Sequence, residues 1–188
     1  SKIELALELL KEAQAFGMKP GYVLFDAWYA AEKIVNWLIG AEWLYVTQLR
    51  SNRKLDGCSL KSYNHPYWVK VGKLNKVKAE AIIIRHGKRF FCSNDLKLDR
   101  KQIQRIYRFR QQVEESFRSL KQEMGWEGMR FRTLQTLTAH LALTLSAYTI
   151  IEMQRYRTKQ TFYKYRRGLI SGRIKPPILV PSAIPLAA

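Results

Sequence analysis

Four polar side chains on one stretch of the chain have types and a spacing that could do chemistry. At about 100° per residue in an α-helix, Tyr107, Arg110, Glu114 and Lys121 fall within an arc of roughly 60°. This arc lies beside an apolar stripe on the same helix, so the four side chains flank a buried seam. A carboxylate between an arginine and a lysine suits a site that holds a metal ion and a phosphate together, because the acid binds the cation and the bases bind the anion.

The same residues also allow a simpler interpretation. Arginine and glutamate four residues apart commonly form an ion pair on a solvated helix face, and geometry alone favours that alternative. Glu115 stands next to Glu114, and the periodicity does not choose strongly between them. Helix geometry therefore leaves both a charged surface and a catalytic face open.

A second carboxylate, Asp26, ends the short apolar run Tyr22–Phe25. Such a run is typical of a buried strand, and ligands in open α/β sheets collect outside the carboxyl ends of the strands. Asp26 could equally be the N-cap of a helix that begins near Tyr29. Together with a helix glutamate, it could form part of a two-metal site for phosphoryl transfer.

The charge of the chain points to polyanionic partners. Thirty-three Lys and Arg against fifteen Asp and Glu give a net charge of +18 and a pI near 10.1. Nucleic acid is the first candidate partner and an anionic membrane the second. Aromatic residues are interleaved with the basic ones throughout, which favours nucleic acid over a merely soluble basic domain. With 47% hydrophobic residues, the chain can bury a core, so disorder is not expected.

Other features bear on compartment and membrane. Two cysteines, Cys58 and Cys92, fit neither a disulfide framework nor a zinc site, and they indicate a cytoplasmic setting. The N-terminal segment is typical of an amphipathic helix and shows no secretory signal. The longest apolar stretch, Leu137–Ile151, is too short to span a bilayer, so we expect no membrane partner.

The elements expected along the chain form an α/β pattern. Helices over 2–16 and 31–39 alternate with strands over 22–25 and 43–49, which favours parallel strands. Residues 50–100 contain short β-favouring runs between turn signals and indicate antiparallel strands, with a hairpin at Ile84–Arg89.

The second half of the chain reads as helical. The periodicity predicts one long helix from Asp99 to Met124, with Gly125 as its C-cap. It also predicts a core helix over about 133–157. We expect the segment from Gly168 onward to be irregular. The basic residues after residue 154 would support DNA binding or form a solvated tail: Arg155, Arg157, Lys159, Lys164, Arg166, Arg167, Arg173 and Lys175.

The spacing Tyr107-x2-Arg110-x3-Glu114-x6-Lys121 resembles the Tyr-Arg-Glu-Lys signature of one large group of bacterial insertion-sequence DDE transposases. The surrounding segment YRFRQQVEESFRSLKQEMG is similar to that group, as is Phe25–Tyr29 around its second catalytic Asp. The resemblance covers roughly residues 1–155 and selects Glu114 over Glu115.

The resemblance implies a partial RNase H-like α/β fold with a β-rich insertion and C-terminal helices. Residues 1–49 would be the RNase H-like part with the second catalytic Asp, and 50–99 the β-rich insertion. Residues 100–158 would hold the catalytic-Glu helix and the following core helix, and 159–188 a basic tail that contains Pro and Gly.

The resemblance also implies roles for the site residues. Asp26 and Glu114 would be catalytic and would bind divalent cations, normally Mg²⁺ or else Mn²⁺, for hydrolysis and strand transfer at transposon ends. Tyr107, Arg110 and Lys121 would contact double-stranded DNA, which they would position without reading its sequence. A homodimer is a further expectation, because paired ends are handled by paired subunits.

The sequence departs from the family pattern in one respect. The family uses three carboxylates, and the first Asp, on the first strand of the fold, has no counterpart here. The acids Glu4, Glu8, Glu12, Asp56, Asp95 and Asp99 have no matching motif context.

We therefore expect a two-metal site that is incomplete in this chain and a transposase whose upstream half is a partner segment. The alternative is a non-catalytic DNA-binding remnant of a transposase. Another RNase H-like nuclease is a more distant option, which the helix signature disfavours.

Overall fold

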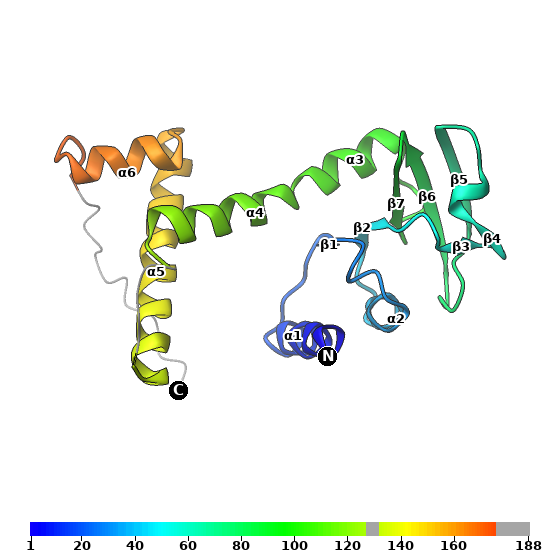
Figure 1. The fold of residues 1–188 in the computed structure, drawn as a ribbon, viewed down its shortest axis with the longest axis horizontal. Coiled ribbons are helices and arrows are strands. Elements are labelled where there is room, and N and C mark those ends of the chain that lie inside the picture. The colour runs from blue at the N-terminus through cyan, green and yellow to red at the C-terminus, as the bar shows by residue number, and fades with distance from the viewer. Residues whose placement is uncertain (127–131, 176–188) are drawn as a thin grey trace. The chain divides into compact units, whose positions relative to one another are not determined.

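A computed structural model describes residues 1–126 and 132–175 of the chain (Figure 1). The chain forms two compact units, Ser1–Val113 and Glu114–Ala188, and each is described by itself.

The first unit is built on a five-stranded sheet in the order β1-β2-β7-β6-β5. β1 and β2 are parallel, with Phe25 paired to Thr47, and the other neighbouring strands are antiparallel. The strands of this sheet span Val23–Phe25 (β1), Tyr45–Leu49 (β2), Tyr67–Lys73 (β5), Glu80–His86 (β6) and Arg89–Ser93 (β7). The expected parallel pair and the hairpin between β6 and β7 are confirmed, and the strands over 67–93 extend the same sheet.

Helices cover both faces of the sheet. On one face lie α1 (Lys2–Ala15) and α2 (Glu32–Gly40), which Figure 1 shows side by side. On the other lies α3 (Arg100–Arg108), with Ile103 in a second buried cluster. The faces follow from the two-residue alternation of strands, since neighbouring residues in β2, β6 and β7 enter opposite clusters. The mixed α/β class is confirmed and is compatible with a partial RNase H-like domain.

A short two-stranded sheet adjoins this core. β3 (Lys54–Leu55) pairs with β4 (Cys58–Ser59), and the 3-10 helix η1 (Leu60–Ser62) follows. Leu55 and Leu60 are fully buried and join this short sheet and η1 to the main core.

The prediction of one helix from Asp99 to Met124 is wrong in its continuity. Three segments occupy that range: α3, α4 (Gln111–Arg118) and the π-helix η2 (Ser119–Glu123). At the first break, Arg110 N–H donates to Tyr107 C=O over 3.0 Å, a tighter three-residue turn than the α-helical pattern. No Pro or Gly marks this point in the sequence. The expected start is confirmed by the Asp99–Gln102 capping box, and Gly125 has the positive φ expected of a helix stop.

In the second unit, α5 (Leu134–Thr158) runs into α6 (Phe162–Ile170). The rings of Tyr148 and Phe162 lie 5.4 Å apart, and Arg166 pairs with Glu123 over 2.9 Å. α6 covers part of the segment expected to be an irregular tail, so that expectation is wrong for 168–170. Residues 176–188 of the expected tail lie outside the described residues.

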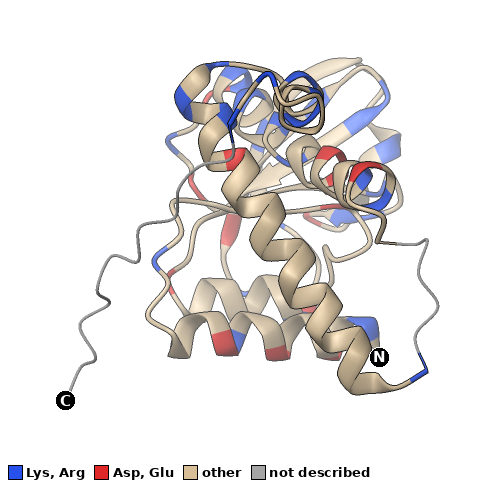
Figure 2. Ribbon diagram, turned by 90° about the vertical axis from the view of Figure 1, so that its left-hand side faces the viewer, with Lys and Arg blue, Asp and Glu red and all other residues tan. Residues whose placement is uncertain are grey.

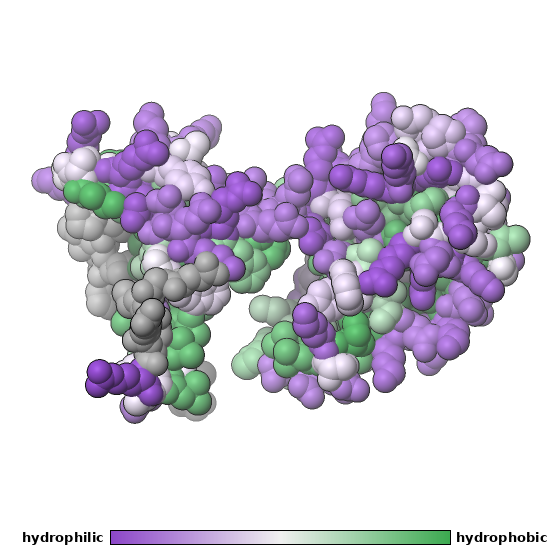
Figure 3. Space-filling model, viewed as in Figure 1, coloured by the Kyte–Doolittle hydropathy of each residue, from purple (hydrophilic) through white to green (hydrophobic). Residues whose placement is uncertain are grey.

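The prediction that α5 packs in the core is also wrong. Thr144 is its one buried residue, whereas Leu134 and Leu143 are 77% and 71% exposed. Figure 3 shows hydrophobic atoms, in green, at the surface along α5. Figure 2 shows α5 nearly free of charge until its last turns. Apolar residues lie all around this helix, so no single stripe can be buried against one neighbour.

The expectation of no membrane partner rested on the short length of an apolar stretch, and α5 is longer than that stretch. At 25 residues, α5 exceeds the apolar stretch Leu137–Ile151 on which that expectation rested. Among the described residues it is the one helix that is long and apolar enough to cross a membrane, by length and composition alone. The helices of soluble proteins can meet the same criteria, so this is weak support for a membrane span.

The two cysteines should differ sharply in reactivity. Cys58 is exposed, whereas Cys92 is buried, and burial raises the pKa of its thiol from 9.0 to about 12. Because the thiolate is the form that attacks alkylating agents, we expect rapid labelling of Cys58 and none of Cys92 in the native protein, as measured by mass spectrometry. As pH rises from 9 to 12, ionisation of Cys92 favours the unfolded chain, so stability falls and labelling of Cys92 should appear together with unfolding. Labelling of Cys92 in folded protein at neutral pH would contradict this.

Candidate active site

Asp26 directly follows β1, and the backbone around it is closely held. Its Oδ1 accepts hydrogen bonds from the backbone N–H groups of Trp28 (2.8 Å) and Tyr29 (3.4 Å). The buried Thr47 hydroxyl donates to the carbonyl of Phe25 over 2.9 Å, across the parallel pair. The carboxylate is therefore fixed at the end of the strand, where an α/β sheet presents ligand groups. The alternative that Asp26 is the N-cap of a helix is wrong, because α2 begins at Glu32 with Ala31 as its N-cap and no side-chain cap hydrogen bond. The contacts of Asp26 instead hold the turn after β1 and leave Oδ2 facing outward.

Arg110 meets that outward oxygen. Its Nη2 lies 3.4 Å from Asp26 Oδ2, and the two side chains are 25% and 32% exposed. A partly exposed pair of this kind contributes at most about 1 kcal/mol to stability. Its importance is positional, because it places a guanidinium that could bind phosphate against a carboxylate that could bind a cation.

Tyr107 packs one turn earlier on the same face of the sheet. Its ring contacts Phe91 edge to face at 5.1 Å, and its hydroxyl donates to Gln48 Oε1 over 3.5 Å. The structure therefore brings together Asp26, Tyr107 and Arg110 in the first unit.

Glu114 and Lys121 belong to the second unit. Glu114 lies in the first turn of α4 and Lys121 in η2, and both side chains are exposed. Between them, Ser116 Oγ accepts a hydrogen bond from the Tyr148 hydroxyl of α5 over 3.0 Å, and Leu120 is buried. These contacts fix how the α4–η2 segment packs on α5.

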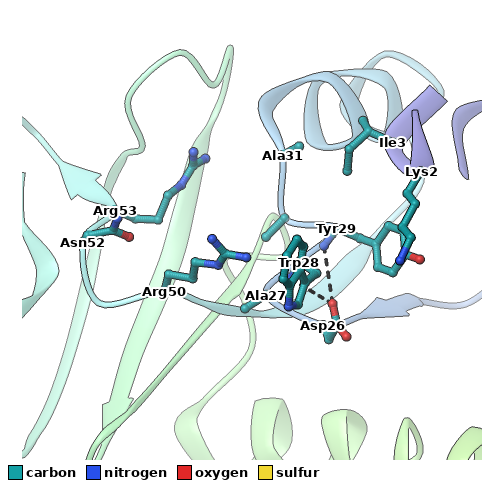
Figure 4. Close-up of a pocket in the computed structure, with 11 residues that line it drawn as sticks. Lys2, Ile3, Asp26, Ala27, Trp28, Tyr29, Ala31, Arg50, Asn52 and Arg53 are labelled. Atoms are coloured by element: carbon teal, nitrogen blue, oxygen red, sulfur yellow. Dashed lines mark hydrogen bonds between the residues drawn. The ribbon is translucent and has the colours of Figure 1, made fainter.

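Three further residues lie beside Asp26 that sequence reasoning did not single out. A cavity of about 790 Å³ is lined by Asp26, Trp28, Arg50 and Arg53, among others (Figure 4). Arg50 follows the end of β2, as Asp26 follows the end of β1. Because the two strands are parallel, their carboxyl ends meet at one edge of the sheet. The rule that selected Asp26 could therefore also have selected Arg50.

The site contains one of the donor groups that a divalent cation needs. Asp26 offers carboxylate oxygens, the hard ligands that Mg²⁺ and Mn²⁺ take. Within residues 1–126 and 132–175, no group of three or more His, Cys, Asp or Glu side chains is arranged to hold a metal ion. The carboxylate of Asp26 therefore has the donor chemistry of one ligand of such a cation.

The Thr47 hydroxyl should be needed for the stability of the strand end. The change Thr47→Val keeps the shape but leaves the Phe25 carbonyl without this buried donor, so we expect a loss of about 1–2 kcal/mol in the free energy of unfolding. Urea unfolding followed by fluorescence measures it. Ser62→Ala, which removes an exposed hydroxyl with its own hydrogen bond to the Ser59 carbonyl, is the matched control. Equal effects of both changes would show that the buried contact has no special role.

Comparison with known proteins adds one match. Residues 1–150 match the protein family described as "Transposase DDE domain". No curated protein matches the chain.

Proposed function

Because this chain belongs to the transposase DDE domain family, we propose that Asp26 and Glu114 are two of the carboxylates of a metal-dependent site that cuts and joins DNA at transposon ends. Proteins of this family carry out DNA transposition and generally use divalent metal ions. The observation that carries the proposal is the meeting of Asp26 and Arg110 at the end of β1.

The chemistry is phosphoryl transfer between DNA strands. A pair of bound divalent cations would activate water or a DNA 3′-hydroxyl for in-line attack and stabilise the leaving oxygen. Asp26 would hold a cation, while the backbone N–H groups of Trp28 and Tyr29 keep its carboxylate in place through Oδ1. Glu114 would supply the second carboxylate from α4.

Arg110 and Lys121 would bind the phosphates of the DNA. The Arg110 guanidinium can hold a phosphate oxygen close to Asp26, because it already lies 3.4 Å from that carboxylate. Tyr107 would contact the same DNA strand from the edge of the site. Such contacts place the DNA without selecting its sequence.

A third carboxylate, besides Asp26 and Glu114, would come from a segment upstream of residue 1, so residues 1–188 by themselves would bind DNA without cutting it. Family resemblance further supports a homodimer that pairs two ends. A second candidate function is DNA binding without cleavage. The net charge of +18 favours it, because phosphate binding by basic residues needs no metal ion.

The test uses DNA that carries the ends of the element and the chain with and without the upstream segment supplied in trans. We expect cleavage only when residues 1–188, the upstream segment and Mg²⁺ or Mn²⁺ are all present, and none after chelation. Cleavage by the chain alone would overturn the proposal that its metal site is incomplete. Cleavage that persists without divalent cations would overturn the metal-dependent mechanism.

A further inference from the structure

A cavity of the second unit, called the α6 cavity below, lies along one face of α6. Its volume is about 710 Å³, and the described residues that line it include three exposed basic side chains, Lys164, Arg167 and Arg173, and no Asp or Glu. Lys164 and Arg167 stand three residues apart, so they share a face of the helix. Thr161 and Ser171 add hydroxyl groups to the lining. The cavity therefore offers the cations and the donors that bind a phosphate group.

Among the residues that the structure describes, no carboxylate pairs with the three basic side chains of the α6 cavity. The nearby acids are already paired: Glu123 with Arg166 over 2.9 Å, and Glu152 with Arg155 over 2.8 Å. Glu152 is also the last acid of the whole sequence. Like charges that line one cavity repel one another, and a bound polyanion removes this repulsion. The α6 cavity is therefore suited to an anion from outside the chain.

Gly168 allows the chain to form this cavity. After α6 the chain turns back (Figure 1), with a φ of +70° at Gly172, and Ile174 N–H donates to the Gly168 carbonyl over 3.0 Å. The Ile174 side chain occupies the space that a Cβ on residue 168 would need. Because Arg173 precedes Ile174, this packing brings Arg173 to the cavity that α6 lines. The cavity thus depends on a close approach that glycine permits.

The buried side of α6 argues against an anionic lipid surface as the partner. A helix that lies on a membrane exposes a broad apolar face to the lipid. In α6, Phe162 and Tyr165 are only 5% and 4% exposed, and the Phe162 ring packs against Tyr148 of α5. Ile170, at the last position of α6, is its one apolar side chain that is more than half exposed. The phosphodiester backbone of DNA, in contrast, needs only accessible cations.

We propose that Lys164, Arg167 and Arg173 bind the phosphodiester backbone of DNA in the α6 cavity. The contacts are ionic and are made to phosphate, so they need no metal ion and read no sequence. The choice of DNA as the polyanion rests on the proposed function. The cavity itself is separate from Asp26 and Arg110, which belong to the first unit. The second unit therefore binds DNA by a site of its own.

The test measures the affinity of the whole chain for a fluorescent DNA duplex of arbitrary sequence by anisotropy, in EDTA so that no metal ion takes part. Arg167→Ala and Arg173→Ala, the two cavity variants, should each weaken binding about tenfold, the effect of one charge-assisted hydrogen bond to phosphate. Arg157→Ala is the matched control, because Arg157 is exposed on α5 and does not line the cavity. It should weaken binding much less. Equal losses in all three variants would show a diffuse basic surface and would overturn the site.

Gly168→Ala tests the shape of the cavity without a change of charge. The added methyl group overlaps Ile174 and should displace the segment that carries Arg173, so we expect several-fold weaker binding to the duplex. Gly40→Ala is its control, because a Cβ on residue 40 of α2 meets nothing within 4 Å. Full binding by a folded Gly168→Ala chain would contradict the proposal. If circular dichroism shows that Gly168→Ala does not fold, the two cavity variants decide the question.

Two other sources of phosphate are distinguished in the same assay. Inorganic phosphate, added at the phosphate concentration of the duplex, should not displace the DNA. Displacement would show a site for small anions and would overturn the proposal. Vesicles of phosphatidylserine test the lipid alternative. If the two cavity variants lose binding to these vesicles while they bind the duplex normally, the partner is a lipid surface and the proposal is wrong.

The outcomes separate this inference from the proposed function. If cleavage requires Asp26 while the two cavity variants bind the duplex normally, the α6 site is wrong and the transposase site stands. If the two cavity variants lose binding to the duplex while cleavage does not require Asp26, the reverse holds.

Discussion

The changes Asp26→Asn and Glu114→Gln will each lower strand cleavage by at least about a thousandfold, the scale on which enzymes lose activity with a catalytic residue. Each change keeps the size of the side chain but removes the negative charge that would bind a cation. Cleavage of end-bearing DNA in Mg²⁺, with the upstream segment present, is the measurement. DNA binding, followed in the same samples, should change little.

Glu115→Gln is the control that the chain itself provides, since Glu115 neighbours Glu114 and is also exposed on α4. It should keep near-normal cleavage. If Glu115→Gln abolished cleavage and Glu114→Gln did not, the assignment of the helix carboxylate would be wrong. If neither change mattered, the family resemblance would not extend to this helix.

The changes Arg110→Ala and Lys121→Ala will each weaken DNA binding by about 1.5–3 kcal/mol, roughly ten- to a hundredfold, because each removes a charge-assisted hydrogen bond to phosphate. The loss of binding should be similar for all DNA sequences. The number of counterions released on binding, which sets the salt dependence of the affinity, should fall by about one. Titration of fluorescent DNA at several salt concentrations measures both quantities. Arg110→Ala should also reduce cleavage, since Arg110 lies against Asp26.

Two exposed arginines serve as controls for these losses. Arg108 and Arg118 stand near the two bases in sequence but outside the spacing of the signature. Arg108→Ala and Arg118→Ala should cost less binding than the two main changes. Equal losses at all four positions would indicate a diffuse basic surface, and the specific roles of Arg110 and Lys121 would then be wrong.

Much of the secondary structure of the first unit could be predicted from the periodicity of its apolar residues. The apolar run before Asp26 and the second run over 43–49 gave the parallel pair of β1 and β2 because buried parallel strands are apolar on both faces. The hairpin at Ile84–Arg89 followed from its turn residues. The expected helix start at Asp99 was confirmed, and the structure adds its cause, a capping box between Asp99 and Gln102 that satisfies N–H groups of the first turn.

Features set by tertiary contacts were not predictable. The break at Arg110 has no Pro or Gly, and a one-dimensional pattern of apolar residues passes through it unchanged. The exposure of α5 was missed for a different reason: its composition is that of a core helix, and burial depends on which neighbours are present. The helix α6 was not predicted, because its basic residues resemble those of a solvated tail.

At the site, the sequence predicted residues but not their contacts. The position of Asp26 followed from the strand-end rule, whereas its pairing with Arg110 joins residues 84 positions apart and needs the fold. Nor could the sequence show that Arg53 buries part of its guanidinium without a partner. The assignment of Glu114 and Lys121 still depends on the signature spacing and stays a prediction.

One measurement tests most directly whether Asp26 and Glu114 share a metal site. The chain, bound to end-bearing DNA and the upstream segment, is loaded with Fe²⁺ in place of Mg²⁺ and treated with ascorbate and peroxide, which release hydroxyl radicals at the bound iron. We predict that the polypeptide is cut next to both Asp26 and Glu114, and that excess Mg²⁺ suppresses both cuts. Cuts at other positions, or at one of the two residues without the other, would contradict the account.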